Sequence, residues 1–344
     1  MRKSKLMNLI LCLLIFSLSV SACSTKETTK KKKKTTKKNT KVESLEDTDE
    51  TDEPSESVDT TVSTETTLHV DTPVTTDTTP VETANDKKSV YTISNEVIVD
   101  DSNCSFIITE ATTDSIWGFT LKVYCENKTA DKNLMFSLNE VSVNGYMVDP
   151  FWATQVAAGK KANDEVSFSS DRFDEIGITS ADEITFSLRI YDYDDWSADP
   201  LIEETYTVYP TGLSPDEVVS PNRLSSPNET VVVDNDQVSF IILGTSTDSI
   251  WGYTLICYLE NKTDKTLMYS WNDVSVNGFM ADPYWASDVA PGKKSYCSIS
   301  FSNSEFEKNG ITEVNSIEYS LRIYDSDDWL ADDVYNGTNT YTPS

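Results

Sequence analysis

The sequence predicts an all-β protein built from two tandem β-sandwiches that follow a disordered stalk. Three observations support this prediction: a long internal repeat, apolar residues that alternate with polar ones, and turn-forming residues between the alternating stretches. Alternation is typical of strands with one buried face, because successive side chains of a strand point to opposite sides of the sheet. Short strands separated by regular turn signals are typical of a sandwich or a barrel.

The first residues have the features of a secretion signal. A basic start, MRKSK, precedes a short apolar stretch at residues 6–18. This stretch is too short to span a bilayer, and it is followed by small residues and Cys23 in the order VSAC. That order resembles a bacterial lipobox, which implies removal of residues 1–22 and attachment of a lipid to Cys23. Ordinary secretion with cleavage just before Cys23 is the alternative.

A lipid at Cys23 predicts where the protein resides. Two or more acyl chains hold a protein stably to a bilayer, whereas one chain does so only marginally. We therefore expect a protein that is anchored by its N-terminal lipid to the outer face of the bacterial cell membrane. Its folded domains would be extracellular.

Residues 23–90 are predicted to form a disordered stalk, because they carry almost no apolar side chains that could build a core. Residues 26–41 contain nine Lys and one Glu, and residues 43–86 contain fourteen acidic residues and no Lys or Arg. A Lys run beside an acylated Cys suits anionic lipid headgroups or wall polyanions, at about 1 kcal/mol per charge near the surface. A solvated linker with no specific partner is the alternative.

The rest of the chain is strongly acidic. Of the formal net charge of −29, residues 87–344 carry −26. This charge argues against a nucleic-acid partner, because few groups there could neutralise phosphates. No second apolar stretch approaches the roughly 18 residues that a membrane-spanning helix needs.

Two copies of one domain follow the stalk. Residues 100–199 and 234–332 share about 58 identities in 99 aligned positions. The shared segments are TDSIWG, ENKT, VSVNG, DPFWA or DPYWA, GKK, and LRIYD-x-DDW. We place the domains at residues 91–209 and 229–344, joined by a proline-rich linker at 210–228.

Strands and turns are predicted at matching places in both copies. Apolar and polar residues alternate over residues 119–125, 184–190 and 317–323. The Asn-Gly pairs at 144–145 and 277–278 predict hairpin turns, because both turn positions need a positive φ.

One helical turn is predicted within SSDRFDEIG. Ser169 or Ser170 would cap its start, and Gly177 would end it. Seven or more short strands, with one helical turn before a long late strand, indicate an immunoglobulin-like β-sandwich. The lipobox, the polar stalk and the pattern V-S-V-N-G … A-x-G-K-K … S-F-S resemble the immunoglobulin-like lipoprotein domains of unknown function in Gram-positive bacteria. The resemblance covers the signal and both repeats and implies no catalytic residues.

Four cysteines fall within the repeats, and none has a Cys at the matching position of the other copy: Cys104, Cys125, Cys257 and Cys297. Pairing Phe106 with Val123 in a hairpin would bring the first two opposite each other. The last two fall on the inward faces of strands that we expect to be neighbours. An extracellular domain permits both disulfides. Buried free thiols that act as small hydrophobic groups are the alternative.

Catalysis is not predicted. His69, the one histidine of the chain, lies in the stalk. The repeats therefore have no imidazole for a Ser-His or Cys-His pair and no histidine ligand for zinc. Acidic residues are so abundant that a pair of carboxylates does not point to a glycosidase.

The doubled acidic phrase is the candidate for a calcium site, the one cofactor that we consider. Calcium takes six to eight oxygen ligands, and each copy places several carboxylates on one loop. The candidate ligands are Asp192, Asp194, Asp195, Asp199, Asp325, Asp327, Asp328 and Asp332. An EF-hand is excluded, because its sixth position requires Gly and here holds Ser197 or Leu330. A solvated acidic turn is the alternative.

The same phrase predicts a recognition surface. We expect the ENKT turn, the DPFWA or DPYWA segment and the YD-x-DDW loop at one end of each sandwich, the end that immunoglobulin-like domains commonly use for binding. TDSIWG and VSVNG are expected at the opposite end. The candidate binding residues are Phe151, Trp152, Asp192, Asp194, Asp195 and Trp196 in the first copy, and Tyr284, Trp285, Asp325, Asp327, Asp328 and Trp329 in the second.

Tryptophan faces beside carboxylates suit either sugar rings or a cationic partner. The predicted function is therefore a non-catalytic surface lipoprotein whose repeats bind an extracellular glycan or protein, with avidity from two copies. The alternatives are a purely structural spacer and a calcium-stabilised adhesion module. Tryptophans that belong to the core would remove the predicted surface.

Overall fold

The protein folds into the predicted all-β class, with 53% strand and 7% helix among the residues that the structure describes. The computed structural model describes residues 91–115, 118–247 and 251–343. Three features named in the sequence analysis lie outside these residues: the predicted lipidation site Cys23, the stalk predicted at 23–90, and His69.

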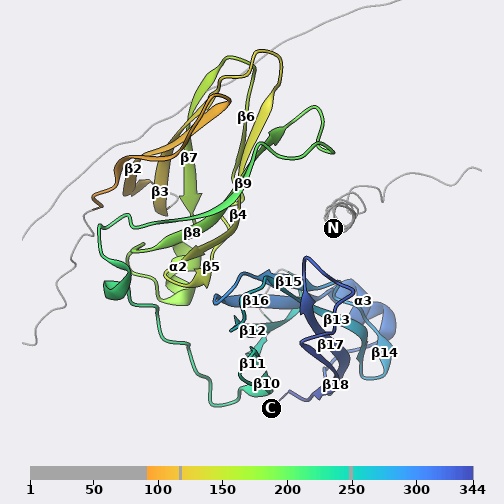
Figure 1. Ribbon diagram of the computed structural model, residues 1–344. Helices are drawn as coiled ribbons and strands as arrows, with labels where there is room; N and C mark the ends of the chain where they lie inside the picture. The colour runs from red at the N-terminus through yellow and green to blue at the C-terminus, as the bar shows by residue number, and fades with distance from the viewer. Residues whose placement is uncertain (1–90, 116–117, 248–250, 344) are drawn as a thin grey trace, which may run out of the picture. The chain divides into compact units, whose positions relative to one another are not determined.

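The first repeat is a sandwich of two antiparallel sheets (Figure 1). One sheet has the order β1-β2-β3-β7, formed by β1 (Ser94–Asp100), β2 (Cys104–Ser115), β3 (Gly118–Asn127) and β7 (Lys161–Phe168). The other has the order β5-β4-β8-β9 with β6 also on β4, formed by β4 (Leu134–Val143), β5 (Tyr146–Met147), β6 (Ala153–Val156), β8 (Ile184–Asp192) and β9 (Ile202–Val208). Helix α2 (Ser170–Ile176) connects β7 to β8.

The second repeat has the same strand order. Its first sheet is β10 (Thr230–Asp234), β11 (Val238–Ser246), β12 (Tyr253–Asn261) and β16 (Lys294–Phe301). Its second sheet is β14 (Phe279–Met280), β13 (Leu267–Val276), β17 (Ile317–Asp325) and β18 (Tyr335–Tyr341), with β15 (Ala286–Val289) also on β13. Helix α3 (Asn303–Asn309) follows β16, and the short 3₁₀ turn η1 (Pro215–Glu217) lies between the repeats. A single parallel bridge pairs β5 with β16.

The predicted alternation is confirmed in the late strands. In β8 the side chains of Ile184, Phe186, Leu188 and Ile190 are buried, and the residues between them are partly exposed. Strand β17 shows nearly the same pattern over residues 317–323. Each sandwich buries such rows from its long strands between its two sheets.

The predicted Asn-Gly hairpin turns are also confirmed. Asn144 and Gly145 have φ values of 49° and 87° and connect β4 to β5. The Asn144 side chain donates to the carbonyl of Ser180 and accepts the N–H groups of Asp182 and Glu183. Asn277 makes the equivalent bonds in the second repeat. The shared VSVNG segment is thus explained by structure, because its Asn ties the hairpin to the chain entering the late strand.

Helix α2 lies at the predicted place. Gly177 ends it with φ 83°, in the left-handed conformation that glycine adopts without strain. Ser169 occupies the N-cap position, but its side chain makes no capping hydrogen bond. The prediction of the helix and its end is confirmed, and the predicted cap by a serine side chain is wrong.

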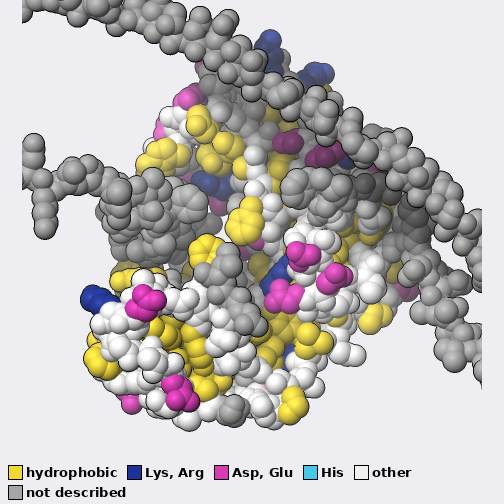
Figure 2. All heavy atoms as spheres, turned by 180° about the vertical axis from the view of Figure 1, so that it is seen from behind, with side chains coloured by type: hydrophobic (Ala, Val, Ile, Leu, Met, Phe, Trp, Pro, Cys, Tyr) yellow, Lys and Arg dark blue, Asp and Glu magenta, His cyan; other side chains and the backbone are white. Residues whose placement is uncertain are grey.

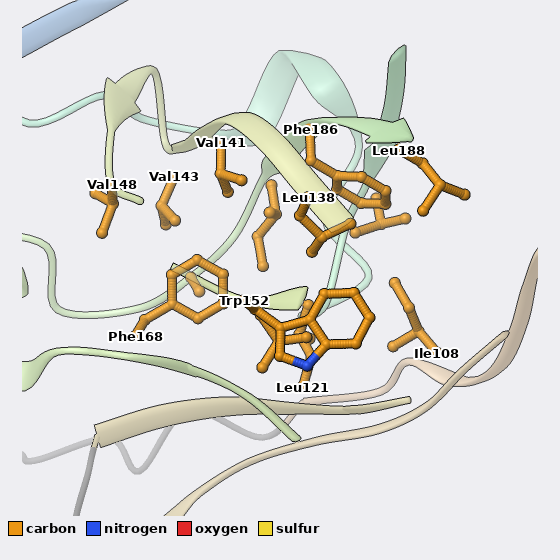
Figure 3. Close-up of a cluster of buried hydrophobic side chains, with 14 of the residues drawn as sticks. Ile108, Leu121, Leu138, Val141, Val143, Val148, Trp152, Phe168, Phe186 and Leu188 are labelled. Atoms are coloured by element: carbon orange, nitrogen blue, oxygen red, sulfur yellow. The ribbon is translucent and has the colours of Figure 1, made fainter. Parts of the chain in front are cut away.

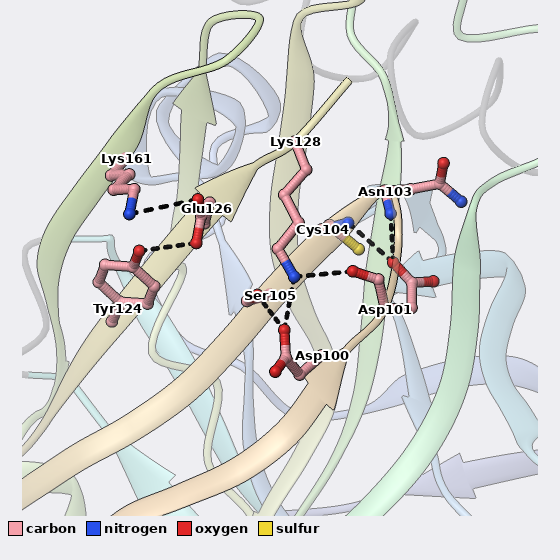
Figure 4. Close-up of polar contacts among 9 residues, drawn as sticks. All are labelled: Asp100, Asp101, Asn103, Cys104, Ser105, Tyr124, Glu126, Lys128 and Lys161. Carbon is pink, nitrogen blue, oxygen red and sulfur yellow. Dashed lines mark hydrogen bonds and ion pairs between the residues drawn. The ribbon is translucent and has the colours of Figure 1, made fainter. Parts of the chain in front are cut away.

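The shared ENKT turn holds the edge of each sandwich together, and Figure 4 shows the contacts of Glu126 and Lys128 in the first repeat. The Asn127 side chain is buried and donates to the carbonyls of Lys132 and Val156, at 2.7 and 2.8 Å. Lys128 reaches back to the Asp100 carboxylate at 2.5 Å, and this contact, followed by a hydrogen bond from Ser105, lowers the pKa of Asp100. Asn261 and Lys262 repeat the arrangement with Asp234. These polar side chains therefore make contacts within their own repeat that stabilise its fold.

Candidate functional site

Trp152 belongs to the core of the first repeat, so its predicted place on a recognition surface is wrong. The side chain is 9% exposed and lies among apolar side chains from both sheets (Figure 3). Its ring centroid is 5.9 Å from that of Phe106. Its indole Nε1–H donates to Asp164 at 3.2 Å, which satisfies the one polar atom of the ring.

Trp285, the matching residue, is only partly buried. It packs against Phe240 and Trp271, with centroids 5.8 and 6.1 Å away. The residue that matches Asp164 is Cys297, so the carboxylate that accepts from Trp152 has no equivalent here. No hydrogen bond joins the Trp285 indole N–H to any residue of the described chain.

In the acidic loops that follow β8 and β17, Asp side chains are bonded to other residues of the same repeat. Asp192 pairs with Lys132 at 3.2 Å, and Asp194 accepts from the Asn133 amide at 2.8 Å. The Ser197 hydroxyl donates to Asp195 at 2.6 Å and lowers the pKa of that carboxyl.

The second loop is held in a similar way. Asp325 pairs with Lys265 at 2.8 Å and accepts the backbone N–H groups of Asp327 and Asp328. Trp196 and Trp329 are 48% and 37% exposed in the two loops.

These carboxylates do not converge on a metal position. Among the residues that the structure describes, no three His, Cys, Asp or Glu side chains are grouped as a metal ion requires. The eight candidate calcium ligands are Asp192, Asp194, Asp195, Asp199, Asp325, Asp327, Asp328 and Asp332. The calcium site and its alternative, a solvated acidic turn, both stay predictions.

The two halves of the predicted surface also lie apart. On β4, Leu138 donates its N–H to the carbonyl of Trp152, whereas Leu134 pairs with Asp192. Four residues of strand separate these positions, or about 13 Å. The prediction that DPFWA and the acidic loop share one surface is therefore wrong. The same separation holds in the second repeat, where Trp271 contacts Trp285 and Leu267 pairs with Asp325.

Residues 283–286 of the DPYWA segment instead line a cleft together with Trp251. The cleft has a volume of about 680 Å³, within the range of about 300–1,000 Å³ that is usual for small-ligand sites. Its lining residues are Trp251, Pro283, Tyr284, Trp285, Ala286, Ser298, Ser300, Ser302, Asn303 and Ser304. None of these side chains is charged, and three are large aromatics. We call this feature the aromatic cleft.

Local backbone geometry presents the aromatic side chains of the cleft. Tyr284 has φ 50°, and its N–H is held by the Asp282 carboxylate at 2.7 Å, while its side chain is 83% exposed. Trp251 is 71% exposed and precedes Gly252. A Cβ on Gly252 would lie 2.3 Å from the carbonyl oxygen of Phe301, so only glycine lets this loop approach the end of β16.

Strand β16 and the start of α3 supply the polar side of the cleft. In the C-terminal half of β16 the side chains of Ser298 and Ser300 alternate with the buried Ile299 and Phe301. Ser300 shares a hydrogen bond with Thr254 at 2.9 Å, and Ser302 shares one with Ser304 at 2.7 Å. A hydroxyl donates one hydrogen bond and accepts two, so these side chains keep acceptor capacity for a ligand.

Trp251 and the cleft serines are not among the residues predicted from the sequence. The predicted strand directions put TDSIWG at the end opposite to the DPYWA segment. In the structure β15 pairs back onto β13, which draws the aromatic segment away from the loop end. The available signal was the alternation in SISFSNS, which puts hydroxyls on one face beside the repeated TDSIWG.

The predicted pairing of Cys104 with Cys125 rests on a register that the structure does not have. Cys104 pairs with Asn127, and Phe106 pairs with Cys125, so the strands are shifted by two residues from the prediction. Both thiols are free and buried, and burial raises the pKa of each to about 12.

Comparisons with known proteins do not assign the cleft. No protein-family model and no curated protein matches the sequence. Among solved structures, the chain is similar to a red sea bream transglutaminase at 12% identity and a TM-score of 0.20. The match covers 72% of this chain and 32% of the transglutaminase, and a TM-score this low carries no argument on fold or function. Within the described residues, no helix has the length and apolar character to cross a membrane.

Proposed function

We propose that this protein is a non-catalytic surface lipoprotein that binds a neutral extracellular glycan in the aromatic cleft of its second repeat. The observation that carries the proposal is the uncharged lining of the cleft in a chain of net charge −29. On the face shown in Figure 2, Asp and Glu side chains are spread among hydrophobic and polar ones. A cleft without carboxylates is distinctive on such a protein.

The lining favours a sugar over a cationic partner. A cation is attracted to aromatic faces, and a carboxylate nearby adds Coulomb attraction that the cleft does not offer. The carboxylates predicted beside the tryptophans lie instead in the acidic loops, engaged by lysines and by backbone N–H groups. What remains in the cleft is aromatic surface for the C–H faces of a sugar ring, with hydroxyl and amide groups for its hydroxyls.

The N-terminal part of the sequence supports display of the cleft outside the cell. The lipobox ending at Cys23 would anchor the chain, and the polar residues up to position 90 would hold the repeats away from the bilayer. A shallow, open cleft suits weak binding that many anchored copies strengthen by avidity.

The test is a screen of neutral and charged oligosaccharides and cell-wall fragments against the full-length protein. We expect binding of neutral oligosaccharides, and loss of at least tenfold in affinity in Tyr284→Ala and in Trp251→Ala. Tyr284 is exposed, so its removal should leave the melting temperature unchanged. The matched control is Phe151→Ala, because Phe151 is the equivalent residue of the first repeat and is 90% exposed.

Two results would count against the proposal. Binding that survives both substitutions places the glycan elsewhere on the protein. A protein that binds no glycan at all but keeps its fold supports the structural-spacer alternative.

A further inference from the structure

Cys257 and Cys297 face each other across two neighbouring strands of the second repeat. Strand β12 pairs antiparallel with β16, and the register sets these two residues directly opposite. Both side chains point toward the same core, where Cys257 is buried completely and Cys297 is partly exposed. Burial, and then contact with the Cys297 thiol, raises the pKa of the Cys257 thiol.

We propose that Cys257 and Cys297 are an oxidisable pair that closes to a cross-strand disulfide. Directly opposed residues of an antiparallel pair have Cα atoms about 4.5 or 5.5 Å apart. Disulfides form at Cα separations of about 4.4–6.8 Å, so the strands need not move apart or together to be joined. The proposal is independent of the glycan-binding function.

The unequal exposure of the two thiols sets the order of the reaction. With a small-molecule disulfide such as oxidised glutathione, the thiolate of Cys297 attacks one sulfur, and one glutathione thiolate leaves. Cys257 then loses its proton to water and attacks the sulfur of Cys297, which expels the second glutathione. Two protein thiols are oxidised, and one disulfide molecule is reduced to two thiols.

The second step should be the slower one. The thiolate is the nucleophile, and burial disfavours the thiolate of Cys257. We therefore expect disulfide formation to accelerate as the pH rises.

The first repeat supplies an internal control. Val123 and Asp164 occupy the two equivalent positions and are likewise opposite each other, so no pair exists there. The other two described cysteines, at 104 and 125, are buried and are not opposite each other. We expect them to stay reduced under conditions that oxidise the second-repeat pair.

The experiment uses the full-length protein, reduced, freed of reductant and incubated with oxidised glutathione. Remaining thiols are alkylated, and the protein is digested without reduction for peptide mapping by mass spectrometry. We expect one cross-linked peptide pair that contains Cys257 and Cys297, with Cys104 and Cys125 alkylated after denaturation. In Cys257→Ser, a glutathione adduct should persist on Cys297.

The outcomes separate clearly. A wild-type protein that keeps both second-repeat thiols alkylatable after long incubation overturns the proposal. So does an adduct on Cys297 that accumulates in the wild type and never converts to the cross-link. Unchanged circular dichroism of Cys257→Ser and Cys297→Ser shows that neither result reflects misfolding.

Discussion

The two repeats share one frame and differ where a ligand would bind. The frame is held by the ENKT and VSVNG side chains, which make the same internal bonds in both copies. Six of the ten residues that line the aromatic cleft are the same in the first repeat, and four differ. Among these four, Ser298 and Ser304 of the second repeat correspond to Glu165 and Asp171 of the first. The two repeats therefore differ at this face mainly in its charge.

The position that holds Asp164 in the first repeat and Cys297 in the second affects both a hydrogen bond and a thiol contact. Asp164 accepts from the buried Trp152 indole in the first repeat. In the second repeat the same position is Cys297, which leaves the Trp285 indole without that carboxylate and creates a thiol opposite Cys257. The thiol pair needs a second difference as well, because the first repeat has Val123 where the second has Cys257.

The repeated segment LRIYD-x-DDW has a structural role that both repeats share. Its apolar residues are the buried row of the late strand, and its first Asp is bound by a lysine in both copies. Arg189 and Arg322 lie over the rings of Tyr191 and Tyr324, at 4.3 and 4.1 Å. These contacts give the shared apolar residues, the Arg and the first Asp a structural role in both repeats.

The largest effect is expected where the frame itself is broken. Gly252→Ala places a Cβ 2.3 Å from the Phe301 carbonyl oxygen at φ 96°, and Gly118→Ala does the same in the first repeat at 2.6 Å from Phe168. Strain and displacement together should lower the free energy of unfolding by about 3 kcal/mol or more in each case.

Urea titration of the two variants measures this loss. Gly244→Ala is the control, because its Cβ would meet nothing within 4 Å. A loss in one repeat only would contradict the view that both copies need the same frame.

The Trp152 bond should show the next largest effect. Asp164→Ala leaves a buried indole N–H unsatisfied, so we expect a loss of about 1–3 kcal/mol in the free energy of unfolding. Asp164→Asn retains an acceptor and should restore most of it. Cys297→Ala removes no acceptor from Trp285 and should cost less than Asp164→Ala. Equal losses in the two repeats would refute the contrast drawn at this position.

Exchanging one residue between the copies tests the cleft directly. Ser298→Glu gives the second repeat the carboxylate of the first, and we expect at least a tenfold loss of neutral-glycan affinity, or about 1.4 kcal/mol. The reciprocal Glu165→Ser should leave that affinity unchanged. Isothermal titration calorimetry measures both. Tight binding by Ser298→Glu would show that the uncharged lining does not govern recognition.

The sequence predicted the frame well because the frame depends on local rules. The alternation of apolar and polar residues predicted the buried side chains of β8 and β17, and the Asn-Gly pairs predicted the hairpin turns. Each of these signals acts within a few residues. The site depended on how distant segments meet. The return of β15 onto β13 and the two-residue shift between β2 and β3 are set by packing across the sandwich, which no local pattern encodes.

The smallest expected effect concerns the acid sensitivity that both repeats share. Lys128 and Lys262 hold the carboxylates of Asp100 and Asp234, and these hydrogen bonds lower the pKa of each carboxyl below its ordinary value of 3.8. A carboxyl whose folded-state pKa is lowered contributes stability that is present above its unfolded-state pKa. That contribution disappears as the pH falls through the lowered folded-state pKa.

We therefore expect Asp100→Asn with Asp234→Asn to lower the melting temperature slightly at pH 7 and to match the wild type at the acid end. Calorimetry between pH 7 and pH 2, with Asp236→Asn as the exposed control, measures the convergence. Parallel curves for the double variant and the wild type would show that these carboxylates contribute nothing through their charge, and a change confined to one repeat would separate two frames that we regard as equivalent.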